Sequence, residues 1–153
     1  MDEVFIKING EKHYLWRAVD HNGEVLECYV SKKRDKKSAQ KFIMKSLKKH
    51  GVPRSFVTDK LASYHAVLRD MGIAYRQITG KRLNNRCENS HLPFRRRERA
   101  MQKFKSLIGL EDFVDIQGPI YNHFNHERHL ISRQTYKQKR TTALNEWYNL
   151  TLA

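Results

Sequence analysis

The sequence has few of the features that cross-link a chain or anchor it in a membrane. Its only cysteines are Cys28 and Cys87, with no CxxC pair, which argues against a disulfide framework and against a cysteine zinc site. No apolar run approaches membrane-spanning length, and the first residues lack the basic-then-apolar pattern of a signal peptide. We therefore expect a cytoplasmic protein with no membrane partner.

Acidic residues are also scarce relative to basic ones. The chain has 30 Lys and Arg against 16 Asp and Glu, a formal net charge of +14. Such a field concentrates polyanions, so we expect nucleic acid as the partner and no small-molecule substrate. The alternative, that the charge only maintains solubility, is disfavoured because the basic residues are clustered.

The length of 153 residues suits a single compact unit. We expect a core over residues 1–106 and a helical extension over 107–153 that packs on it. Alternating apolar residues over 3–8, with similar segments over 13–19 and 25–30, predict three opening strands. The turn residues between them predict an antiparallel meander.

Helical and strand signals then alternate. Apolar residues at helical spacing predict a helix over 36–50 that Gly51 ends. A short buried strand at 56–58, a helix over 60–71 and a strand over 73–78 should follow. With another helix from Asn85, the order becomes βββαβαβα, an α/β fold.

The rest of the chain is expected to be helical. Pro93 should kink or restart the helix that begins near residue 85, because proline removes one backbone bond. Residues 107–124 should form a helix with interruptions at its glycines and proline, and residues 142–150 a short terminal helix. That last helix should bury Leu144, Trp147 and Tyr148.

Three acidic residues occupy positions from which this fold could gather their carboxylates. Asp2 begins the first strand, Asp59 directly follows the buried strand at 56–58, and Glu88 lies in the following helix. Loops at the carboxyl ends of parallel strands form the usual binding edge of such sheets. Grouped carboxylates suit divalent cations.

Each acid also has an ordinary structural explanation. Asp59 could cap the helix that follows it, Glu88 could form a capping box with Asn85, and Asp2 could be a solvated terminal residue. Asp2 nevertheless shares a strand face with Val4 and other apolar residues at period two. Taken singly, each acid favours the structural explanation, so the functional hypothesis rests on their joint placement.

Segments along nearly the whole chain resemble the bacterial insertion-sequence-six family of transposases. The matching segments include Asp2-Glu3-Val4, Val57-Thr58-Asp59-Lys60, Glu88-Asn89-Ser90-His91, Arg95-Arg96-Arg97 and Tyr121-Asn122-His123-Phe124-Asn125. The resemblance implies an RNase H-like mixed sheet with flanking helices, similar to the catalytic domain of retroviral integrase. It also implies an Asp-Asp-Glu triad at Asp2, Asp59 and Glu88 that holds Mg²⁺ or Mn²⁺, with two ions expected.

The function implied by the resemblance is DNA strand cleavage and strand transfer in the transposition of an insertion sequence. The partners implied are element ends, target DNA and further copies of the chain. Family members usually carry an N-terminal helix-turn-helix region before the first catalytic aspartate, where this sequence has Met1. Two alternatives remain open: a truncated, non-catalytic remnant that binds DNA or pairs with full-length transposase, and an RNase H-like nuclease unconnected with transposition.

Basic and polar residues after position 84 are the candidates for DNA binding. They are Asn85, Arg86, His91, Arg95, Arg96, Arg97, Arg99, Lys103 and Lys105. Arginine binds phosphate through paired donors, although a solvated helix face would give the same composition. A zinc site at His123, His126 and His129 is disfavoured, because three-residue steps rotate around a helix and no fourth ligand is evident.

Overall fold

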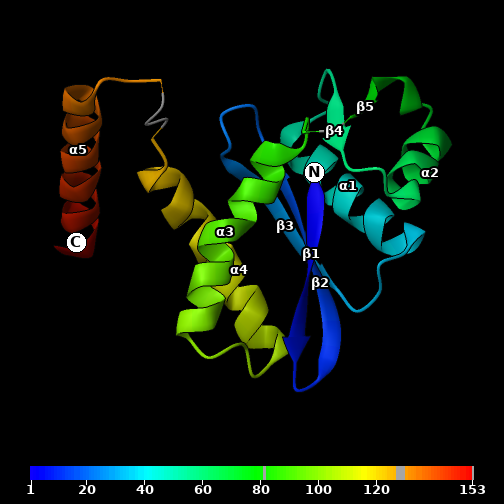
Figure 1. The fold of residues 1–153 in the computed structure, drawn as a ribbon, viewed down its shortest axis with the longest axis horizontal. Coiled ribbons are helices and arrows are strands. Elements are labelled where there is room, and N and C mark those ends of the chain that lie inside the picture. Colours follow the sequence, from blue (N-terminus) through cyan, green and yellow to red (C-terminus); the bar gives the residue numbers. More distant parts are fainter. Residues whose placement is uncertain (81, 127–129, 153) are drawn as a thin grey trace.

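The computed structural model describes residues 1–80, 82–126 and 130–152. The elements are β1 (Asp2–Ile8), β2 (Glu11–Val19), β3 (Val25–Ser31), α1 (Lys36–His50), β4 (Phe56–Thr58), α2 (Ala62–Asp70), the 3₁₀ turn η1 (Ala74–Arg76), β5 (Gln77–Thr79), α3 (Asn85–Ala100), α4 (Leu107–Phe124) and α5 (Arg133–Leu152), shown in Figure 1. The predicted α/β class and the predicted order of strands and helices are confirmed.

The first three strands form an antiparallel sheet in the order β1-β2-β3. Asn9 and Gly10 join β1 to β2 with φ angles of 50° and 85°. Positive φ at both central residues is what a two-residue hairpin of type I′ requires, and an Asn-Gly pair tolerates it well. The turn therefore fixes the register that places Asp2 opposite Arg17.

The mixed sheet is divided into two parts. β4 and β5 form a separate two-stranded parallel sheet beside the start of β1. The Met1 ammonium donates a hydrogen bond to the Val57 carbonyl at 2.7 Å and connects the two parts. The end of β4 is thereby held next to the beginning of β1.

Helices cover both faces of the antiparallel sheet. On one face, Ile6 and Leu15 pack in a buried cluster with Phe94 of α3 and Leu110 of α4. On the other face, Trp16 packs with residues of α1 and α2. Because successive strand residues point to opposite faces, β2 and β3 contribute to both clusters, whereas the apolar residues of β1 belong to the first. Figure 1 shows the helices on the two sides of the sheet. α4 thus packs directly on the sheet, and the division of the chain at residue 106 stays a prediction.

The expected restart of α3 at Pro93 and the expected interruptions of α4 at its glycines and proline are wrong. α3 continues through Pro93, and α4 continues through Gly109 and Pro119. A proline removes only its own backbone donor, and burial of Phe94 directly after Pro93 holds the helix on the sheet. Tertiary packing therefore outweighs these local signals.

The segment over 73–78 is only partly a strand, because η1 precedes the short β5. The terminal helix is also longer than predicted, and the expected burial of its apolar residues is wrong. Leu144, Trp147 and Tyr148 are 49%, 37% and 62% exposed. α5 contacts the C-terminal end of α4, where the Trp147 ring lies 5.8 Å from the Phe124 ring. Its apolar residues are spread around the helix, so no continuous face packs against the rest of the chain.

The remaining expectations concern cysteines, histidines and the membrane. Cys28 and Cys87 are both free and buried. His123 contacts the Ala143 carbonyl at 2.8 Å, and His126 lies against the Tyr136 ring, while His129 is outside the described residues. Within the described ranges, no helix has the length and apolar character needed to cross a membrane.

Arg17 is a buried cation that joins three elements. Its Nη1 donates to the Ser90 carbonyl in α3, and its Nη2 donates to Gln117 Oε1 in α4 at 3.2 Å. The guanidinium also lies 5.5 Å from the centre of the Phe94 ring. The side chain is fully buried, so these contacts replace its hydration.

We expect Arg17→Met to lower the free energy of unfolding by about 2–4 kcal/mol, because two acceptors lose a charged donor. Urea unfolding followed by circular dichroism would measure the change. Arg96→Met, at an exposed position of α3, should change the free energy by less than about 0.5 kcal/mol. Equal urea midpoints for the two variants would contradict the role of Arg17.

Candidate metal centre

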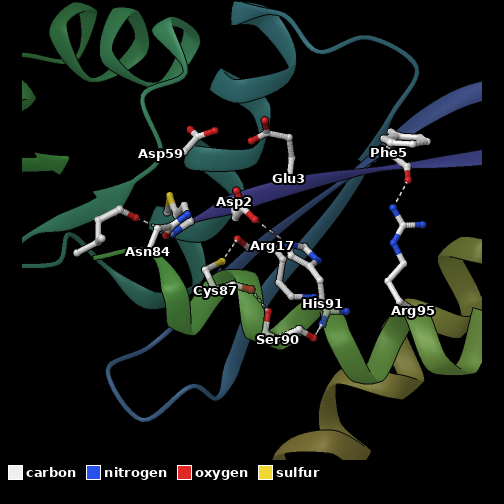
Figure 2. A network of polar contacts seen from close by, with 12 residues as sticks. Asp2, Glu3, Phe5, Arg17, Asp59, Asn84, Cys87, Ser90, His91 and Arg95 are labelled. Carbon is white, nitrogen blue, oxygen red and sulfur yellow. Dashed lines mark hydrogen bonds and ion pairs between the residues drawn. The ribbon is translucent and has the colours of Figure 1, made fainter. Parts of the chain in front are cut away.

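The candidate site lies where the start of β1, the end of β4 and the first turns of α3 come together (Figure 2). β1 supplies Asp2 and Glu3, and Asp59 directly follows β4. The bond from the Met1 ammonium to Val57 aligns these two segments. Residues almost sixty positions apart therefore meet because two strand ends are adjacent.

Asp2, Glu3 and Asp59 form a group of carboxylates, called here the acidic cluster. One oxygen from each lies within 4.8 Å of the others. Anionic oxygens in this number suit a hard divalent cation such as Mg²⁺. Among the described residues, no other group of three His, Cys, Asp or Glu side chains has this geometry. The structure brings Asp2 and Asp59 together, and it adds Glu3.

Asp2 faces α3. His91 Nε2 lies 3.3 Å from Asp2 Oδ2, and both side chains are largely buried. Burial lowers the His91 pKa, although the neighbouring Asp2 carboxylate opposes that effect. A neutral His91 beside Asp2 fits this balance, so His91 belongs to the surroundings of the acidic cluster and is not on the exposed surface where DNA binding was predicted.

Glu3 points to the opposite face of β1 and was missed by the sequence analysis. Its side chain is only 1% exposed. Tyr64 donates its hydroxyl hydrogen to Glu3 Oε2 at 3.0 Å, and Arg34 donates to Glu3 Oε1. Burial raises the Glu3 pKa, and the nearby Asp59 raises it further, whereas the contacts with Arg34 and Tyr64 lower it.

A signal for Glu3 was present in the sequence. The period-two pattern that aligns Asp2 with Val4 puts Glu3 on the face that carries Trp16 in the partner strand. An acid on a face that packs against a tryptophan needs buried donors. Those donors, Arg34 and Tyr64, come from distant segments, so the sequence alone did not reveal them.

The two oxygens of Asp59 have different partners. Oδ1 accepts a hydrogen bond from the Leu61 amide at 3.0 Å, just before α2 begins at Ala62. Oδ2 lies 3.5 Å from Arg34 Nη2, on the side of the acidic cluster. The expected capping role is wrong, because the N-cap of α2 is Leu61 and has no side-chain cap bond; the Asp59 side chain instead orders the turn ahead of the helix.

Glu88 lies on the first turn of α3 and is exposed. It is not part of the group whose oxygens lie within 4.8 Å. His91, which contacts Asp2, lies one helical turn after Glu88. Glu88 is therefore on the helix that borders the acidic cluster. The capping box with Asn85 is not formed, because α3 starts at Asn85 and its N-cap is Asn84, whose side chain makes no cap bond.

The predicted DNA-binding residues fall into two groups. Arg95 is engaged within the protein, since it donates to the Phe5 carbonyl and to Glu98. The other basic members lie exposed on or just after α3, where the described residues provide no ion pair for them: Arg86, Arg96, Arg97, Arg99, Lys103 and Lys105. Asn85 is exposed at the start of the same helix.

Comparisons with known proteins address the family of the chain. A family model described as a DDE domain, of the IS240 transposase type, matches residues 1–127. A Staphylococcus aureus protein named as the transposase for the insertion sequence-like element IS431mec is 35% identical over 96 residues, which are 60% of this chain and 43% of that protein. The transposase of element IS257 in transposon Tn4003, also from Staphylococcus aureus, matches to the same extent.

A further relative is an uncharacterized protein, pYV0051, of Yersinia pseudotuberculosis, which is 41% identical over 75 residues, or 46% of this chain and 70% of that protein. No solved structure matches the chain. The aligned part of the chain spans less than half the length of the Staphylococcus transposases. The family match covers most of the chain, including the acidic cluster, α3 and α4. The chain therefore belongs to the DDE-domain family of insertion-sequence transposases.

Proposed function

We propose that this chain is the catalytic domain of a transposase that cuts DNA strands and joins them during transposition of an insertion sequence. The observation that carries the proposal is the meeting of Asp2 and Asp59 in one acidic cluster, within a chain that matches the DDE domain. The two Staphylococcus relatives are named as transposases of insertion elements, which supports the same role here.

The donor set fits a divalent metal. Three carboxylates close together repel one another, so their ionised forms are stabilised when a cation lies between them. We propose Mg²⁺ or Mn²⁺, held by Asp2 and Asp59, with Glu88 as the third ligand that the family resemblance implies. A pair of such ions held by these residues would supply activation of the attacking oxygen and stabilisation of the leaving oxygen of a phosphodiester.

The protein residues have separate tasks in this proposal. His91 packs against Asp2 and fixes the side of the cluster that faces α3. The Leu61 amide holds Asp59 at the end of β4. With water as the nucleophile the reaction is strand nicking, and with a 3′-hydroxyl it is strand transfer to target DNA.

The exposed basic residues of α3 are proposed to hold the DNA backbone. They lie on the same helix as Glu88, so phosphates bound there would pass close to the acidic cluster. Joining of DNA ends requires more than one DNA segment, and we propose that copies of the chain act together as a homo-oligomer in the bacterial cytoplasm. DNA binding by the wild type without any metal-dependent cleavage would instead favour the non-catalytic remnant.

We expect Glu3→Gln to raise the melting temperature in EDTA at pH 7.5. The raised Glu3 pKa means that the folded state favours the protonated carboxyl, so the ionised form costs stability. This cost develops as the pH rises through the raised pKa and is absent below the ordinary value of 4.5. The difference between variant and wild type should therefore shrink as the pH falls towards 4.5.

Melting curves at several pH values would measure this effect. Glu24→Gln, at an exposed position, is the matched control and should leave the melting temperature nearly unchanged. A variant less stable than the wild type at pH 7.5 would show that Glu3 is favourably ionised.

Asp59→Asn and Glu88→Gln should each reduce Mg²⁺- or Mn²⁺-dependent nicking and strand transfer by more than about 100-fold, because loss of even an outer partner of a metal ligand costs 10–100-fold. DNA affinity should stay the same or increase slightly, since a negative charge is removed. Cleavage of labelled element ends and gel-shift titrations would measure the two properties. Retained nicking in both variants would refute the assignment.

Replacing Arg96, Arg97 and Arg99 together with glutamine should weaken DNA binding and flatten its salt dependence. Each lost phosphate contact removes about 0.9 from the slope of log K against log salt. Fluorescence anisotropy at several salt concentrations would measure the slope. A control that neutralises Lys7, Arg54 and Arg69, which lie on other exposed elements, should change the slope less. An unchanged slope in the α3 variant would mean that these arginines face solvent and contact no phosphate.

A further inference from the structure

We propose that Arg34 is a positioning residue that serves as a built-in counter-ion of the acidic cluster and that a divalent metal must displace it in order to bind. The inference rests on the proposed metal-dependent function. It concerns a residue outside the predicted triad, in the segment between β3 and α1.

The backbone around Arg34 is held in place by the start of α1. The next residue, Asp35, is the N-cap of that helix, and its side chain accepts a hydrogen bond from the Ser38 amide at 2.8 Å. This contact fixes the chain on one side of Arg34. The guanidinium therefore extends towards the cluster from a well-defined anchor.

The Arg34 guanidinium contacts two of the three carboxylates. Its Nε donates to Glu3 Oε1 at 2.5 Å, and its Nη2 is paired with the same oxygen. Nη2 also lies 3.5 Å from Asp59 Oδ2. A planar guanidinium can contact two acceptors at once, and it remains protonated under all ordinary conditions.

The relative burial of the two partners shows on which side Arg34 lies. Its side chain is 42% exposed, whereas that of Glu3 is 1% exposed. Arg34 thus covers Glu3 from the solvent side. It can swing outwards without disturbing the packed interior, while Glu3 cannot.

Other cations near the cluster have different partners. Arg17 donates to Ser90 and Gln117, and the Met1 ammonium donates to Val57. In the described part of the chain, Arg34 is the permanently charged side chain that is ion-paired with the cluster. It therefore supplies the positive charge that partly offsets the repulsion among the three acids.

A metal ion and Arg34 would compete for Asp59 Oδ2. That oxygen lies 3.5 Å from Arg34 Nη2, and the other Asp59 oxygen, Oδ1, already accepts a hydrogen bond from the Leu61 amide. Removing Arg34 should accordingly have two opposite effects. The metal-free protein becomes less stable, and its affinity for the metal becomes higher.

The test is a titration with Mn²⁺ alone, in which the free ion is followed by electron paramagnetic resonance, on the complete chain without DNA. Arg34→Gln should bind Mn²⁺ about 3–10-fold more tightly than the wild type, as expected for removal of one partly solvated charge at contact distance. In EDTA its melting temperature should fall, and the increase on adding saturating Mn²⁺ should be larger than for the wild type.

Lys36→Gln is the matched control, because it removes one charge from the neighbouring helix but interrupts only a contact with Asp70. It should leave the Mn²⁺ affinity nearly unchanged. Arg34→Lys keeps the charge but cannot bridge both carboxylates, so its affinity should lie between those of the wild type and Arg34→Gln. Arg34→Lys also provides the test of the inference if Arg34→Gln does not fold.

Equal or weaker Mn²⁺ binding by the Arg34 variants would overturn the inference while the wild-type metal site stands. The same tightening in Lys36→Gln would also overturn it, because the effect would then follow from net charge. If the wild type itself binds no Mn²⁺, the proposed metal site fails and the inference fails with it.

Discussion

The position of β1 determines the rest of the site. Its register with β2 is fixed by the turn at Asn9 and Gly10, and the residue before it, Met1, is tied to β4 through the bond from its ammonium to Val57. Because strand residues alternate between faces, Asp2 is directed to α3 and Glu3 to the side of α2. One strand end thus presents carboxylates to both helical layers, next to the residue that follows β4.

Much of the fold could be predicted because its signals are local. Alternation identified β1 to β3, and helical spacing together with Gly51 gave the bounds of α1. Errors arose where tertiary contacts decide the outcome. Pro93 is tolerated because Phe94 is packed on the sheet, and α5 has no apolar face through which packing could be recognised. Sequence periodicity predicts the conformation that one segment favours by itself, whereas the continuity of α3 and the exposure of α5 depend on contacts with other segments.

The site was predictable only in part for the same reason. Asp2 and Asp59 follow from topology, since one begins a strand and the other follows a neighbouring strand. Glu3 and Arg34 form a pair across 31 positions of sequence, and only the folded chain shows that they meet. The placement of Glu88 remains a prediction from the family resemblance. Glu88 is exposed on α3 and takes no part in the contacts that Glu3 makes with Arg34 and Tyr64.

The hydrogen bond between Asp59 and the Leu61 amide limits how that carboxylate can coordinate an ion. Oδ1 accepts a hydrogen bond from the Leu61 amide ahead of α2, so Oδ2, which lies 3.5 Å from Arg34 Nη2, is the oxygen that a cation would take once Arg34 moves away. Under the proposed function, ligation through one Asp59 oxygen would leave other ligand positions of the ion to water and to phosphate oxygens. A backbone contact that orders a helix end would in this way reserve coordination positions for the substrate.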